Sequence, residues 1–177
     1  MMSANTKYVL DANAFIQSKR KYYAFDICPG YWAALIWHHA QGAVCSIDRV
    51  AAELERGGDD VWAWVQSKLP EGFFASTDHP EVIARYGQVV AWAQAQDQFL
   101  SEAKAEFSDQ DNADAWLIAY AKASGRVLVT LEEHDPFIRK AVRIPNVCRA
   151  AGVDVEYVTT FDMLRALRAK FNWHPPT

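Results

Sequence analysis

The stretch KYVLDANAFIQ, residues 7–17, places a carboxylate directly after an apolar run. Residues 7–10 predict a short buried strand, Asp11 follows at its end, and Asn13 comes two positions later. A carboxylate in that place needs solvent, a partner or a metal ion, because burying it alone is costly. Asp11 therefore either caps a helix that begins at Ala12 or belongs to an active site.

Short apolar segments alternate with helical patterns along the rest of the chain. This alternation predicts an α/β sandwich with a mostly parallel central sheet. Residues 71–80 are expected to form a loop, and Ser108 or Asp109 is expected to cap the helix that ends before Gly125. Strands are expected at 43–47, 126–130 and 153–159, and helices at 29–42, 48–58, 59–70, 81–107 (one long or two short), 108–125 and 160–171.

The composition is that of one ordinary globular domain spanning residues 1–177, with its core at about 7–171. Hydrophobic residues make up 51% and charged residues 23%, a balance that excludes disordered and fibrous classes. Three widely separated cysteines favour free thiols over a disulfide framework. No leader pattern and no apolar run of about 18 residues is evident, so we expect a cytoplasmic protein without membrane contact.

Several acidic residues lie near the expected carboxyl ends of strands, where parallel sheets bind their ligands. Four carboxylates brought together repel one another, and the arrangement is tolerable mainly if divalent cations fill it. Mg²⁺ or Mn²⁺ suits such oxygen ligands and supports phosphodiester hydrolysis by metal-activated water. The candidate ligands are Asp11, Glu53, Asp114 and Glu132, with Asp135 as a substitute for Glu132, and Asn13 is expected to orient a carboxylate or a water molecule.

Each of these residues also has a purely structural explanation. Glu53 lies beside Glu55 and Arg56, as on a solvated helix face, and Asn13 could be a turn residue. Asp114 is in a first helical turn, where the helix dipole stabilises negative charge. The case for an active site therefore depends on the whole set and its order along the strand ends.

Four motifs make the sequence resemble the PIN domain, a metal-dependent nuclease fold found in many bacterial and archaeal toxins. They are YVLDANAFI, VAAELERG, DNADAWLIAYAKASG and VLVTLEE, and the resemblance extends from about Lys7 to Phe171. It implies a PIN-like three-layer α/β/α sandwich in which Asp11, Glu53, Asp114 and an acid after Thr130 hold the metal. For that fourth acid, family members use the position of either Glu132 or Asp135, and we favour Glu132.

The resemblance also implies a biological setting. Family members commonly cleave RNA, and toxin members are neutralised by an antitoxin that blocks the cleft. The expected function is therefore a Mg²⁺- or Mn²⁺-dependent endoribonuclease, with a toxin of a type II toxin–antitoxin pair as one role. The chain is longer than a minimal toxin, mostly within residues 58–107, which bears on the toxin role more than on the fold.

Two basic clusters could contact an RNA substrate. Lys19, Arg20 and Lys21 precede two tyrosines, a combination suited to phosphate contacts and base stacking. Arg143 belongs to a second cluster with Arg139 and Lys140, close after the fourth motif. Solvated surface loops explain both clusters equally well.

Two other function classes remain open on the sequence. A phosphatase of the haloacid dehalogenase type also begins with an Asp after a strand, but it requires a second Asp where this chain has Asn13. A non-catalytic PIN-like module that binds RNA or a protein partner is the other, and the intact set of acids argues against it.

Some of the seven Trp could lie in a homodimer contact.

Overall fold

A five-stranded sheet in which every neighbouring pair is parallel forms the centre of the computed structural model, which describes residues 6–172. The strand order is β3-β2-β1-β4-β5. The α/β prediction with a mostly parallel sheet is confirmed. The strands are β1 (Tyr8–Leu10), β2 (Val44–Ile47), β3 (Phe74–Ala75), β4 (Val127–Val129) and β5 (Tyr157–Val158).

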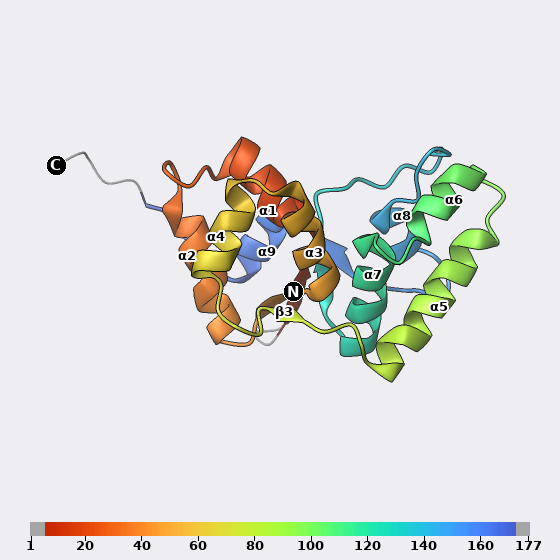
Figure 1. Cartoon of the computed structure of the whole chain (residues 1–177), viewed down its shortest axis with the longest axis horizontal. Coiled ribbons are helices and arrows are strands. Elements are labelled where there is room, and N and C mark those ends of the chain that lie inside the picture. Colours follow the sequence, from red (N-terminus) through yellow and green to blue (C-terminus); the bar gives the residue numbers. More distant parts are fainter. Residues whose placement is uncertain (1–5, 173–177) are drawn as a thin grey trace.

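Helices flank this sheet on both sides and complete a three-layer α/β/α sandwich (Figure 1). In Figure 1, α2, α4 and α9 lie to one side of the strands, and α5, α6 and α7 lie to the other. The helices are α1 (Asn13–Gln17), η1 (Ser18–Tyr22, a π-helical turn), α2 (Pro29–Ala40), α3 (Asp48–Gly57), α4 (Asp60–Lys68), α5 (Pro80–Gln94), α6 (Ser101–Phe107), α7 (Ala113–Ser124), α8 (Ile144–Cys148) and α9 (Thr160–Ala166). Within residues 6–172, none of the helices is both long and apolar enough to cross a membrane.

The strand order creates a switch point between β1 and β4. From β1 the chain proceeds to β2 and β3 on one side of the sheet, whereas β4 and β5 extend it on the other. The two central strands end together, because the Asp11 N–H donates to the Val129 carbonyl at 3.0 Å. In open parallel sheets this is the place where ligands bind.

Two local predictions need correction. Residues 71–80 are not all loop, because Phe74–Ala75 pairs with Ser46 and Ile47 as edge strand β3. A two-residue strand has too little periodicity to be recognised in a sequence. The cap of α7 is neither Ser108 nor Asp109, since the Asn112 side chain accepts the hydrogen bond from the Asp114 N–H.

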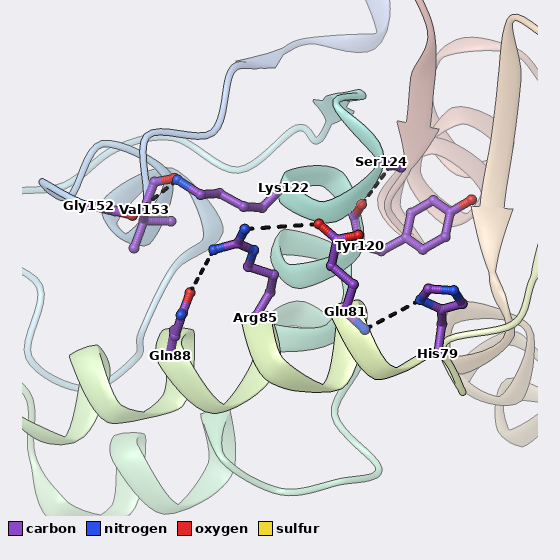
Figure 2. A network of polar contacts seen from close by, with 9 residues as sticks. All are labelled: His79, Glu81, Arg85, Gln88, Tyr120, Lys122, Ser124, Gly152 and Val153. Atoms are coloured by element: carbon purple, nitrogen blue, oxygen red, sulfur yellow. Dashed lines mark hydrogen bonds and ion pairs between the residues drawn. The ribbon is translucent and has the colours of Figure 1, made fainter.

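Polar contacts lie within α5 and its N-cap, and others join α7 to the turn at Gly152 and Val153 (Figure 2). Arg85 lies 3.9 Å from the Glu81 carboxylate and donates to Gln88 on the same helix. On α7, the Lys122 ammonium donates to the carbonyls of Gly152 and Val153. We call the residues drawn in Figure 2 the distal network, because it lies at the C-terminal end of α7, away from the switch point.

Candidate acidic site at the switch point

Asp11 lies at the end of β1 and is buried, with only 3% of its surface exposed. One carboxylate oxygen, Oδ2, accepts from the Thr130 hydroxyl at 2.8 Å and from the Asn13 side-chain amide at 3.0 Å. Burial raises the pKa of Asp11, while these contacts and the backbone N–H groups of Ala12 and Asn13 lower it. The N-cap residue of α1 is Ala12, and no side chain within residues 6–172 caps this helix. The Asp11 carboxylate is held instead by the Asn13 amide and by Thr130 at the end of the neighbouring strand.

Hydrogen bonds hold both the backbone and the side chain of Glu132. Its N–H donates to the Thr130 hydroxyl at 3.1 Å, and its Oε2 accepts from the Ile144 N–H at 2.8 Å. Burial is the main reason that its pKa is raised; the Ile144 N–H opposes that effect, Asp11 adds to it and Arg143 opposes it. Thr130 therefore links the two carboxylates, because it donates to Asp11 and accepts from the backbone of Glu132.

Asp114 lies in the first turn of α7 and is the centre of the electrostatic interactions. Its carboxylate accepts no hydrogen bond and joins no ion pair within residues 6–172. Burial raises the pKa of Asp114 well above its usual value, and the neighbouring acids raise it further in the order Asp11, Glu132, Glu53 and Glu106. A carboxyl so surrounded by like charge is one that a cation would stabilise strongly.

Glu53 reaches the same place from α3. Burial and the nearby Asp11 raise its pKa, and Arg56, one turn further along the helix, lowers it. Arg56 also donates to the Asp111 carbonyl at 2.9 Å, and Arg49 donates to the Gln110 carbonyl at 3.4 Å. The two arginines tie α3 to the turn before α7, which brings the Glu53 and Asp114 helices together.

We call Asp11, Glu53, Asp114 and Glu132 the acidic site. A cavity of about 140 Å³ adjoins it and is lined by Asp114, Glu132, Asn112 and Glu106 among others. Glu106 belongs to α6 and was missed by the sequence analysis. No signal could have singled it out, because it is one of several acids in a helical pattern far from any strand end.

The donor set consists only of carboxylate oxygens, which suits a hard divalent cation such as Mg²⁺ or Mn²⁺. The side chains influence one another's pKa values, yet in residues 6–172 no three His, Cys, Asp or Glu residues already converge as ligands of one ion. Mutual repulsion accounts for carboxylates that are neighbours without touching. The residues that could hold a cation are those of the acidic site.

The structure separates the two candidates for the fourth acid. Glu132 is among the groups that raise the pKa of Asp114, whereas Asp135 is not. The Asp135 carboxylate instead accepts from the Phe137 N–H at 2.9 Å and so shapes the following turn. The preferred residue, Glu132, is the one placed in the acidic site.

The structure also distinguishes among the basic residues that were predicted to contact substrate. Lys19 forms an ion pair with Asp60 at 2.6 Å, Arg20 lies 3.7 Å from Asp59, and Lys21 is exposed. Of the four basic residues predicted to contact substrate, Arg143 is the one whose charge acts on the acidic site, through Glu132. Its guanidinium also donates to the Glu133 carbonyl at 3.2 Å.

Fold and site together define an α/β protein with a carboxylate cluster at the switch point of a parallel sheet. Residues 8–171 match a family described as a domain of unknown function, DUF4411. The chain belongs to that family. No curated protein matches it.

Proposed function

We propose that the protein is a Mg²⁺- or Mn²⁺-dependent endoribonuclease. The observation that carries this proposal is Asp114, whose pKa is raised by burial and by the other carboxylates of the acidic site. A group whose pKa is shifted by burial and by neighbouring charges, and that lines a cavity as Asp114 does, is a candidate functional residue. The four PIN-like motifs supply the same residues and support nuclease chemistry.

The acidic site would hold the cation through Asp11, Glu53, Asp114 and Glu132. A divalent ion bound there supplies charge neutralisation for a phosphodiester and makes water a stronger nucleophile at neutral pH. Asp11 and Glu132 are oriented before any ligand arrives, because Thr130, Asn13 and the Ile144 N–H fix their oxygens. Asp114 and Glu53, which accept no hydrogen bond in residues 6–172, are left to turn toward a ligand.

The choice of RNA as substrate rests on the resemblance to PIN domains. The same resemblance supports a cytoplasmic toxin of a type II pair, with an antitoxin that covers the acidic site. A homodimer is a further partner proposal, and Trp37 supports it, because 59% of this large side chain is exposed on α2.

Cleavage of a mixed single-stranded RNA pool by the purified protein tests the proposal. We expect cutting with Mn²⁺ or Mg²⁺, none with EDTA, and none in Glu53→Gln. Glu55→Gln is the matched control, because Glu55 lies on the same helix but is exposed. The control should cut like the wild type.

Other results would contradict the nuclease. Metal-dependent release of phosphate from small phosphomonoesters without RNA cutting would favour a phosphatase. RNA binding without any turnover in a folded protein would favour a non-catalytic module.

A further inference from the structure

Phe137 is the most exposed large hydrophobic residue in the described part of the chain, with 87% of its surface accessible. It lies in the connection between β4 and α8, residues 130–143. A phenyl ring in water is unfavourable by the free energy of the apolar area that it leaves exposed. Its exposure therefore invites an explanation.

The backbone on either side of Phe137 is firmly anchored. The Gln98 side chain donates to the Pro136 carbonyl at 3.0 Å and to the Ile138 carbonyl at 2.7 Å. The next residue is also held, because the Leu100 N–H donates to the Arg139 carbonyl at 2.9 Å. Ile138 packs against the core. The fold thus holds the residues flanking Phe137 in place while leaving its ring in solvent.

The connection that carries Phe137 starts and ends at the acidic site. Glu132 contacts Thr130 at the beginning of the connection and the Ile144 N–H at its end. Phe137 is five residues from Glu132, so their Cα atoms are at most about 18 Å apart. In Figure 1 the connection runs from the sheet toward the start of α6, which agrees with its contacts to Gln98 and Leu100.

The neighbours of Phe137 indicate the kind of ligand. Arg139 and Lys140 come after Ile138 and are exposed, and the charge of Arg143 acts on Glu132. A protein-docking surface needs a contiguous apolar patch, whereas this is a single ring among charged side chains. One ring combined with cations is the arrangement by which proteins bind single-stranded nucleic acid, with a base on the ring and phosphates on the cations.

We propose that Phe137 stacks on an unpaired base of a single-stranded RNA whose backbone continues into the acidic site. Arg139 and Lys140 contact the phosphates next to that base. The identity of the nucleic acid rests on the proposed function. The stacking itself makes the protein selective for single strands, because paired bases do not offer a free face.

Binding of a single-stranded RNA of about 12 nucleotides, measured in an Asp114→Asn background that does not cut it, tests the proposal. We expect Phe137→Ala to weaken binding about tenfold, Phe137→Trp to restore it, and Phe137→Leu to leave it weak. Ile27→Ala is the matched control, because Ile27 is 80% exposed but lies before α2. It should bind like its parent, and duplex RNA should not respond to Phe137→Ala.

The outcomes separate this inference from the nuclease proposal. Equal affinities of the Ala variant and its parent would overturn stacking, even if the wild type cuts RNA, and would leave a protein as the partner of Phe137. Binding that depends on Phe137 without cutting by the wild type would support stacking and overturn the nuclease. If Phe137→Leu binds RNA as well as its parent, the ring contributes by apolar burial and not by base stacking, which overturns the proposal. If Ile27→Ala also loses affinity, the effect is not specific to Phe137, which overturns the proposal as well.

Discussion

Charged side chains at the two ends of α7 differ in whether they have partners. At its C-terminal end Lys122 donates to two carbonyls, and Arg85 and Glu81 on the adjoining helix form an ion pair (Figure 2). At its N-terminal end Asp114 has no such partner and instead faces other acids. Both ends belong to the same twelve-residue helix, so the difference does not arise from helix formation itself.

The comparison separates charge that serves the fold from charge that opposes it. Buried polar groups are normally paired, because an unpaired one costs free energy. In the distal network the Lys122 ammonium and the Arg85 guanidinium have oxygen partners, whereas the Asp114 carboxylate of the acidic site has no such partner within residues 6–172. Such a departure is expected where a ligand completes the arrangement.

The largest effect should come from removing the central acid. Asp114→Asn should lower metal-dependent RNA cleavage by at least about 100-fold, because even residues that only orient metal ligands are worth 10–100-fold. Its free energy of unfolding should stay the same or rise, since like-charge repulsion is relieved. Urea unfolding beside the cleavage assay measures both effects.

Asp111→Asn is the control, because Asp111 is exposed in the turn that precedes α7. An unfolded Asp114→Asn protein would contradict the view that this carboxylate opposes the fold.

The second prediction compares the two candidates for the fourth acid. Glu132→Gln should lower the cleavage rate by more than about tenfold, whereas Asp135→Asn should change it little, because Asp135 shapes a turn. Initial rates at saturating Mn²⁺ provide the measurement. The opposite ranking would move the fourth acid to Asp135.

The third prediction concerns the other end of α7. Lys122→Met should leave cleavage unchanged and lower the free energy of unfolding by about 1–3 kcal/mol, because two carbonyls lose their donor. Chemical denaturation of the variant and the wild type measures this. A loss of activity without a loss of stability would contradict the division of the helix into a structural and a functional end.

The smallest effect is a dependence of stability on pH. The raised pKa of Asp114 means that the folded protein keeps a proton that the unfolded chain releases at about pH 4. The contribution of Asp114 to stability therefore falls as pH rises through the window between its unfolded and folded pKa values. We expect the stability of Asp114→Asn relative to wild type to increase across that window.

Unfolding free energies of both proteins, measured from about pH 4 to neutrality, show the trend. A difference that stays constant with pH would mean that the carboxyl is not perturbed.

Much of this arrangement could be predicted from the sequence. Asp11 directly follows β1, and Glu132 comes after Thr130 and Leu131 at the end of β4, so the parallel sheet brings both acids to the same edge. The helix ends at Gly58 and Gly125 were also predicted, because glycine commonly ends helices. In the structure both glycines adopt the left-handed conformation that closes a helix.

Other features could not be predicted, because they depend on tertiary contacts. Glu106 reaches the acidic site only because α6 and the start of α7 line the same cavity, and no periodicity encodes that. Lys19 was predicted to contact RNA, but in the structure it forms an ion pair with Asp60, which is distant in the sequence. The exposure of Phe137 depends on anchoring by Gln98, which is equally invisible in the sequence.

The pairing of β1 with β4 has a consequence for synthesis of the protein. Tyr8 is paired with Val127, and Asp11 obtains its hydroxyl donor from Thr130. A chain leaving the ribosome emerges N-terminus first, so its central strand must wait for most of the protein before its second neighbour exists. The acidic site is completed only once Ile144 has emerged to hold Glu132, and the nascent chain therefore lacks an assembled site until late in translation.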